Sequence, residues 1–244
     1  MTSVLVFIFG AVIGSVLNIF IYGLPHNQFI SPFFCPYCKN SLKWYKNIPI
    51  LGLFFIKGHC NHCKRPLSWQ IPLVETLTAL FTLGVYLKYA LCFVLFVYLI
   101  LGYSLITIAF IDLRWKIIPD VITLPGIFLG IFASFLLPEI TFKEAALGAA
   151  LGGGGLYLFA LGYHILTKRE GMGGGDIKLL AMIGAFLGWK AILPVIFLAS
   201  LFGTVIGLTI MIWKKKDRYL AIPFGPFLSL GTLIILFKPH LFPW

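Results

Sequence analysis

Residues 171–180 are Gly-Met-Gly-Gly-Gly-Asp-Ile-Lys-Leu-Leu, a glycine-rich turn that leads one carboxylate into the start of an apolar helix. The chain has only 8 acidic residues in 244, and most of it is apolar. An acidic side chain at the edge of a membrane is unfavourable unless it has a partner or a function. Two interpretations of Asp176 are open: it caps the helix that follows, or it takes part in chemistry.

The composition indicates a membrane protein. Hydrophobic residues make up 60% of the chain and charged residues 11%, which is typical of a polytopic helical membrane protein and not of a soluble domain. The net charge of +11 does not indicate nucleic-acid binding, because the basic residues lie in short clusters between apolar runs. No basic residue precedes the first apolar run, residues 4–22, so we expect a retained transmembrane helix and not a cleaved signal peptide.

The apolar runs predict an all-α membrane protein with eight transmembrane helices and a cytoplasmic zinc-binding insertion between the first two. The insertion is the only long polar segment. We expect three parts: a first helix in residues 1–25, the insertion in 26–70 and a seven-helix membrane domain in 71–244. The predicted spans are residues 4–22, 71–86, 90–111, 118–137, 145–166, 176–188, 191–213 and 227–237.

The distribution of charge orients these spans. With eight spans, fifteen of the 19 basic residues fall in connections on one side. The positive-inside rule places that side in the cytoplasm and both termini outside. Asp112 and Asp176 then emerge at the same cytoplasmic face, whereas a count wrong by one helix would separate them.

The insertion contains the strongest local signal. Cys35-Pro-Tyr-Cys38 is followed after 21 residues by Cys60-Asn-His-Cys63, a spacing typical of a tetrahedral zinc site with four thiolates. Disulfides are the alternative, but the predicted side of the membrane is reducing. A closed shell of four cysteines indicates a structural metal. The fifth cysteine, Cys92, is expected to be a small buried apolar residue.

Two carboxylates at matching depth are the second signal. Asp112 ends one predicted helix and Asp176 begins another. Hydrolysis of a peptide bond by two carboxyl groups needs one ionised and one protonated, a division that close approach itself favours. The alternative is capping together with ion pairs to Arg114 or Lys178. Asp120, expected as an N-cap, is the competing acidic candidate.

Three further features allow a structural and a functional interpretation. Glu75 is a functional candidate near the inner end of the second span, or it complements the dipole of a first helical turn. Asn18 is expected to make an interhelical hydrogen bond. Gly148 and Gly152, with the glycines up to Gly155, indicate close helix packing.

Taken together, these motifs closely resemble the bacterial type IV prepilin peptidases, bifunctional leader peptidases and N-methyltransferases of pilus and type II secretion systems. The matching motif around Asp176 is the GxGD element of intramembrane aspartyl proteases. The chain departs from the family at Gly23 and Gln70, where arginine is common. The motifs that carry the resemblance are residues 14–25, 35–63, 72–75, 111–120, 170–180 and 223–226.

The resemblance implies that Asp112 and Asp176 are the catalytic dyad. It implies cleavage of the basic leader of prepilins or pseudopilins on the cytoplasmic side of the bacterial inner membrane. Methylation of the new N-terminus would follow, with S-adenosylmethionine as donor and Zn²⁺ as structural metal. The lipid bilayer and a second copy of the chain are further expected partners. Expected contacts are Glu75 to the cofactor and Gly173, Gly175 and Lys178 near the substrate.

Two other function classes remain as alternatives. A proton or cation transporter usually has ionisable groups near the membrane midplane and inverted repeats, whereas here the acids lie at one edge and no repeat is evident. A non-enzymatic assembly scaffold would use the zinc segment to bind partners, but it would have no need for the glycine-flanked acids.

Overall fold

The computed structural model describes residues 2–26, 38, 62–63, 68–168, 173–214 and 223–238. In these residues the chain is helical throughout, with eight α-helices and no strand. This agrees with the predicted all-α class. The chain divides into two compact units, Met1–Thr107 and Ile108–Trp244, which are described separately.

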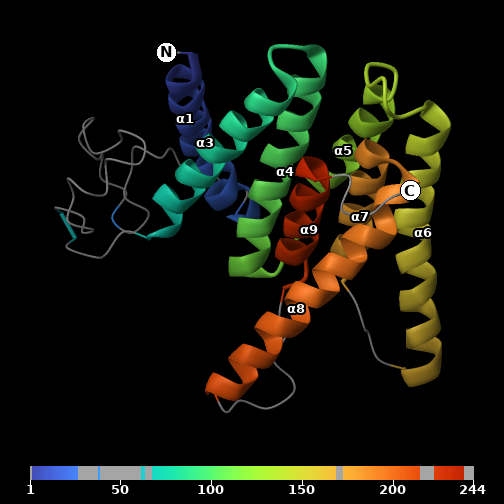
Figure 1. Ribbon diagram of the computed structural model, residues 1–244. Helices are drawn as coiled ribbons and strands as arrows, with labels where there is room; N and C mark the ends of the chain where they lie inside the picture. Colours follow the sequence, from blue (N-terminus) through green and yellow to red (C-terminus); the bar gives the residue numbers. More distant parts are fainter. Residues whose placement is uncertain are drawn as a thin grey trace. The chain divides into compact units, whose positions relative to one another are not determined.

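The first unit contains two complete α-helices and most of a third (Figure 1). They are α1 (Thr2–Gly23), which continues into the 3-10 turn η1 (Leu24–His26), α3 (Gln70–Tyr89) and α4 (Phe93–Trp115).

Glycines let α1 and α3 pack closely and antiparallel. A Cβ atom on Gly10 would lie 2.8 Å from an α3 Cα atom, and one on Gly14 would lie 2.6 Å from the Glu75 Cα atom. Small residues four apart allow this approach of two backbones. One turn further along, the Asn18 Nδ2 donates to the Ile71 carbonyl at 3.1 Å, which confirms the predicted interhelical hydrogen bond.

The second unit is built around a buried helix, α7. All residues from 179 to 186 are buried, and α7 packs against α5, α6 and α9. The elements are the end of α4, α5 (Asp120–Ala133), α6 (Phe142–Thr167), α7 (Gly174–Leu187), η3 (Trp189–Ala191), α8 (Ile192–Lys214) and α9 (Gly225–Phe237).

The packing around α7 again depends on glycine. A Cβ atom on Gly152 of α6 would lie 2.6 Å from the Leu180 carbonyl oxygen, and Gly148 faces the backbone of Gly184. The order of these contacts shows that α6 runs antiparallel to α7. The close packing predicted for Gly148 and Gly152 is therefore confirmed. Its extension to Gly154 and Gly155 is wrong, because a Cβ atom on either would meet no described atom within 4 Å.

Five helices are long and apolar enough to cross a membrane, namely α1, α3, α4, α6 and the combined η3–α8 segment. The remaining three, α5, α7 and α9, have 14, 14 and 13 residues. At 1.5 Å per residue they are about 20 Å long, short of the roughly 30 Å hydrocarbon core. The expected eight helices are thus present among the described residues, but three are shorter than a full span.

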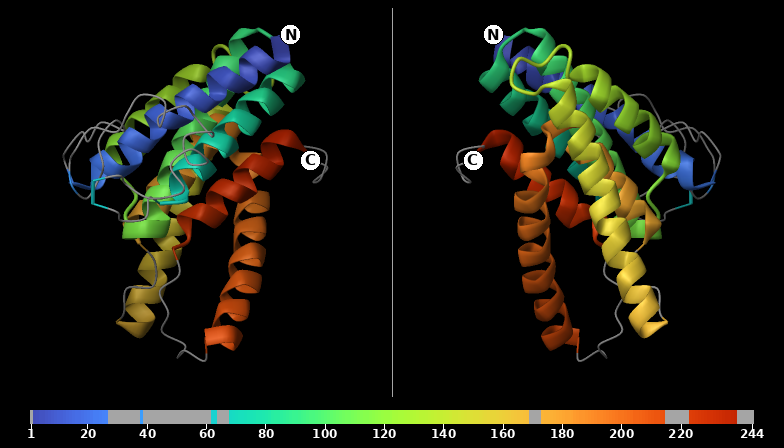
Figure 2. Two further views of the ribbon diagram at one scale, coloured as in Figure 1. Left: turned by 90° about the vertical axis from the view of Figure 1, so that its left-hand side faces the viewer. Right: turned by 90° about the vertical axis from the view of Figure 1, so that its right-hand side faces the viewer.

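The shorter helices begin beside the middle of longer ones. Gly153 of α6 lies next to Ile177 of α7, so the rest of α6 continues past the start of α7. Gly203 of α8 lies next to Phe227 of α9, so α8 likewise continues past the start of α9. Figure 2 shows α6 and α8 extending beyond the two short helices.

The start of α6 differs from the prediction. The helix begins at Phe142, three residues earlier than expected, because Thr141 and Glu144 form a capping box. Such reciprocal hydrogen bonds satisfy backbone N–H groups that would otherwise lack partners.

The prediction of a buried Cys92 is wrong. Cys92 is exposed in the turn between α3 and α4, where its thiol donates to the Tyr89 carbonyl at 3.0 Å. Its apolar neighbours in the sequence belong to the helices on either side, whereas the cysteine itself lies in the connection.

Candidate active site

Four helix ends meet in the second unit: the end of α4 and the starts of α5, α7 and α9. Asp112 lies in the last turn of α4 and Asp176 in the first turn of α7. The alternating helix directions expected from the sequence place both acids at the same end, and the tertiary structure brings these ends together.

Ile118 joins the starts of α7 and α9. A Cβ atom on Gly175 would lie 2.7 Å from the Ile118 Cβ, and one on Gly225 would lie 3.3 Å from the Ile118 Cδ1. Because Ile118 lies in the short connection after α4, it packs the segment that follows Asp112 against the turn that carries Asp176.

Asp112 is almost completely buried, with 5% of its surface exposed. Its Oδ2 accepts a hydrogen bond of 2.9 Å from the Gly225 backbone N–H. Gly225 is the first residue of α9, and the N-terminus of a helix stabilises a nearby negative charge. A Cβ atom on Gly225 would lie only 2.7 Å from the same oxygen, so this approach needs glycine.

Asp176 is partly exposed and is not the helix cap. The N-cap of α7 is Gly173, which makes no side-chain capping bond, and the helix begins at Gly174. The capping interpretation of Asp176 is therefore wrong. Within the described residues its carboxylate accepts no hydrogen bond, and it lies close enough to Asp112 for the two groups to interact electrostatically.

Asp120 and Lys178 form an ion pair beside the two acids. The Lys178 Nζ lies 2.7 Å from both Asp120 oxygens. The Lys178 side chain points away from the Asp176 side chain, because residues two apart on a helix point to opposite sides. The alternative interpretation, in which Lys178 pairs with Asp112 or Asp176, is thus wrong. The N-cap role predicted for Asp120 is also wrong, because Pro119 is the N-cap of α5.

Comparison with known proteins decides the family. The sequence model described as "Type IV leader peptidase family" matches residues 99–208, and that of the bacterial peptidase A24 N-terminal domain matches residues 8–89. A prepilin leader peptidase/N-methyltransferase of Aeromonas hydrophila is 33% identical over 98% of this chain and 92% of its own length. The protein of the same name from Xanthomonas campestris is 37% identical over 87% of this chain and 74% of its own length.

The chain belongs to the type IV leader peptidase family. It is therefore an enzyme, a peptidase and methyltransferase, and a multi-pass protein of the inner membrane. Membership of an enzyme family sets aside the transporter and scaffold alternatives. No solved structure matches the chain significantly.

The ion pair of this leader peptidase allows a first prediction. The Lys178 and Asp120 side chains are 39% and 54% exposed, and exposed pairs contribute about 0–1 kcal/mol to stability. Asp120→Asn should therefore lower the free energy of unfolding by less than about 1 kcal/mol and leave most peptidase activity. Thermal unfolding and an initial-rate assay would measure both. Loss of activity as complete as that of Asp176→Asn would instead make Asp120 a member of the reacting pair.

The glycines of the peptidase motif have different surroundings. Gly175 packs against Ile118, as described above, so a side chain there would displace the connection after α4. Among the described residues, a Cβ atom on Gly173 would meet only the Asp176 Oδ2, at 3.6 Å. Gly173 thus remains the better candidate for a position next to substrate, while Gly171 and Met172 lie outside the described residues.

Glu75 lies in the first unit, between α1 and α3. It is 7% exposed, and its Oε1 accepts a hydrogen bond of 2.6 Å from the Ser15 hydroxyl. Because α3 begins at Gln70, Glu75 is in the second turn, and the first-turn dipole interpretation is wrong. Asn18 lies one turn away on α1 and is also buried, whereas Ser15 is partly buried. These side chains form a polar cluster between α1 and α3.

The predicted zinc ligands lie mainly outside the described residues. This holds for Cys35 and Cys60, whereas Cys38 and Cys63 are each in a turn and partly buried. Among the side chains that the structure describes, no group of three or more His, Cys, Asp or Glu could hold a metal ion. The four-thiolate site stays a prediction.

Sequence reasoning missed two of the contacts at this site. It did not find the Gly225 N–H that binds Asp112, nor the Asp120–Lys178 pair. The available signal for the first was Pro-Phe-Gly-Pro in residues 223–226, where a glycine lies between a bulky residue and the proline of a helix start.

Proposed function

We propose that this enzyme is a membrane aspartyl endopeptidase that removes the leader peptide of type IV prepilins or pseudopilins, with Asp112 and Asp176 as the catalytic pair. The observation that carries the proposal is that the ends of α4 and α7 hold these two carboxyl groups close enough to interact electrostatically, with the Gly225 N–H donating to Asp112. The substrate class follows the names of the relatives.

The reaction needs one ionised and one protonated carboxyl group. The ionised group takes a proton from water as the water oxygen attacks the scissile carbonyl carbon. The protonated group gives its proton to the carbonyl oxygen. Collapse of the tetrahedral intermediate breaks the C–N bond, and a proton passes to the leaving amine. The two groups share one proton at rest and titrate as a unit.

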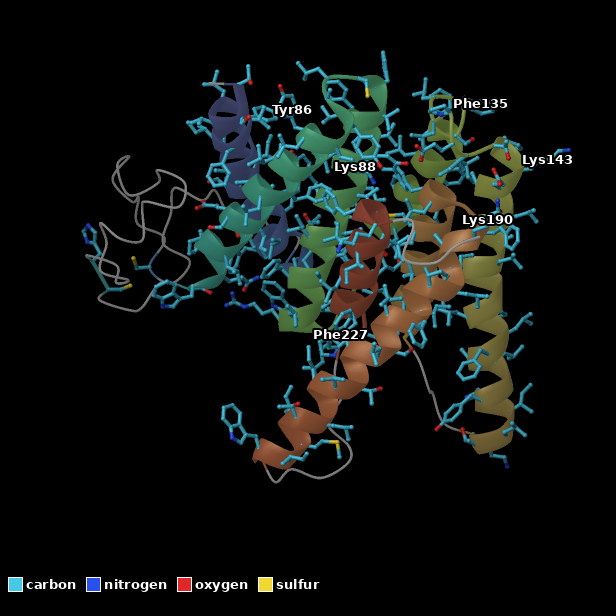
Figure 3. The ribbon with its side chains drawn as sticks, in the orientation of Figure 1. Tyr86, Lys88, Phe135, Lys143, Lys190 and Phe227 are labelled. Carbon is cyan, nitrogen blue, oxygen red and sulfur yellow. The ribbon has the colours of Figure 1, made fainter. Side chains whose placement is uncertain are left out.

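The helix lengths support a site at the cytoplasmic membrane interface. All eight helices would be membrane elements, with both termini outside. Because α5, α7 and α9 are short, α6 and α8 would continue further toward the cytoplasm than the starts of these three helices. The starts would then lie within the depth of the membrane, where an apolar substrate can meet water. Lys143 and Lys190, assigned to the outer side, lie where α6 and α8 begin (Figure 3).

The methyltransferase activity would use residues 26–70 and the polar cluster of the first unit. S-Adenosylmethionine supplies the methyl group. Glu75, as a buried carboxylate, would accept hydrogen bonds from the amino or ribose groups of this cofactor. Zn²⁺ held by Cys35, Cys38, Cys60 and Cys63 would stabilise the segment, since a short polar segment has little core of its own.

Removing the zinc ligands provides a second prediction. A Cys35→Ser, Cys60→Ser variant should lose bound zinc, as measured by metal analysis of the purified protein, and its polar segment should become more sensitive to protease. A Cys92→Ser variant is the matched control, because Cys92 is exposed and distant in sequence from the knuckles. Unchanged zinc content in the double variant would contradict the four-cysteine site.

The proposed function is tested with purified enzyme and a prepilin in detergent. Mass spectrometry of the product should show a new N-terminus after the leader, with one added methyl group only when S-adenosylmethionine is present. Cleavage should not need the methyl donor. Absence of any cleavage by enzyme that is folded and monodisperse would overturn the peptidase assignment for prepilins.

A further inference from the structure

A groove lies between α6 and α8 in the second unit, with a volume of about 700 Å³. Its walls are mostly apolar and include Gly155, Leu156 and Phe159 from α6 and Leu193 and Ile196 from α8. On each helix the first and last lining residues are eight residues apart, which corresponds to about 12 Å or two helical turns. The groove can therefore hold part of an apolar helix, but not a whole transmembrane span.

One residue of the groove lies next to the candidate active site in the chain. Phe224 lines the groove and directly precedes Gly225, whose N–H binds Asp112. A chain whose scissile bond lies at the two aspartates can therefore place its next residues against Phe224 and then between α6 and α8.

Glycines on α6 distinguish this groove from ordinary lipid-facing surface. Of the four consecutive glycines in α6, Gly152 and Gly153 pack against α7. Cβ atoms on Gly154 and Gly155, by contrast, would meet none of the described atoms within 4 Å. Glycine destabilises a helix interior relative to alanine, so packing against the described part of the chain does not account for Gly155. Gly162, seven residues later on the same face, is also open.

Close approach of another helix accounts for Gly155, which lines the groove. Small residues on one helix face allow backbones to approach within a membrane, whereas a lipid acyl chain makes no such demand. Ser200 of α8 also lines the groove and offers a hydroxyl group for an interhelical hydrogen bond.

We propose that the α6–α8 groove binds the apolar helical segment of the substrate that directly follows the scissile bond. This inference rests on the proposed peptidase function and identifies where the membrane-inserted part of the substrate binds. The groove would determine which apolar sequences can follow a cleavable bond, separately from the chemistry at the aspartates.

Neighbouring glycines provide a matched test. Gly155→Leu should partly fill the groove without an internal clash. It should raise KM for a full-length prepilin in phospholipid vesicles by about tenfold or more, with little change in kcat. Gly154→Leu has the same open surroundings but does not line the groove, so its kinetics should be those of the wild type. Equal kinetics for the two variants would overturn the proposal.

A cross-linking experiment tests the occupant directly. A photoreactive benzoylphenylalanine in place of Phe159, in an Asp112→Asn background that retains substrate, should cross-link to the residues just after the cleavage site. The same group at Leu158, outside the groove, should not. Labelling of lipid alone from position 159 would overturn the proposal. Failure of the cross-link would not reject the proposed peptidase function, provided that the wild type cleaves prepilin and Asp112→Asn does not.

Discussion

Asp112→Asn and Asp176→Asn should each lower prepilin cleavage by at least about a thousandfold while the protein stays folded. Asparagine has nearly the shape of aspartate but can neither take a proton from water nor give one to a carbonyl oxygen. Because both steps need a carboxyl group, either change alone should remove the reaction. The rate of product formation, measured by gel or mass spectrometry with purified enzyme, is the readout.

Glu139→Gln is the control for these two variants. Glu139 is exposed in the turn between α5 and α6. Its replacement therefore also removes one carboxyl group from the chain, but outside the candidate active site. It should leave the rate unchanged. Methylation of a substrate that has already been cleaved should continue in both aspartate variants, since the proposed cofactor contact, Glu75, belongs to the first unit. Substantial cleavage by either aspartate variant would reject the proposed pair.

Gly225→Ala should reduce kcat by about 100-fold, which is the order of loss expected when a reacting group is misplaced by about 1 Å. The added methyl group would lie 2.7 Å from the Asp112 Oδ2 and 3.3 Å from the Ile118 Cδ1, so the carboxylate must move. Alanine keeps the backbone N–H, and it is a better helix former than glycine. The effect therefore arises from displacement of Asp112 and not from loss of α9.

Gly203→Ala provides a matched comparison for this variant. A Cβ atom there would lie 3.4 Å from the Phe227 ring, which is ordinary van der Waals contact. Gly203→Ala should keep both activity and thermal stability close to those of the wild type. If Gly225→Ala is also fully active, the Gly225–Asp112 approach does not position the reacting carboxylate.

The sequence places Asp112 and Asp176 at one face by counting helices, whereas their assignment as a catalytic pair comes from the family resemblance. Apolar run lengths give the number of helices, and the side on which each connection lies follows from counting them. Basic clusters then assign that side to the cytoplasm. Asp112 and Asp176 were thereby expected at one face, and the structure places their carboxyl groups near each other.

Helix starts were less predictable, because caps depend on a few atoms. Asp120 is expected as a cap, and capping is one of two interpretations of Asp176, but Pro119 and Gly173 hold those positions and make no side-chain cap bond. An acidic residue at a predicted start is consistent with position N1 or N3 as well as with the cap. The actual partner of Asp120 is Lys178, 58 residues later, which no local pattern identifies.

The sequence by itself determined the all-helical membrane class, the family motifs and the two acids at one face, since all of these follow from composition, spacing and the order of helices. Only the tertiary structure showed that α5, α7 and α9 begin beside longer helices. It alone placed the Gly225 N–H on Asp112, and it revealed the groove from Phe224 along Gly155. These features depend on which helices pack together and how closely, and residues far apart in sequence decide that jointly.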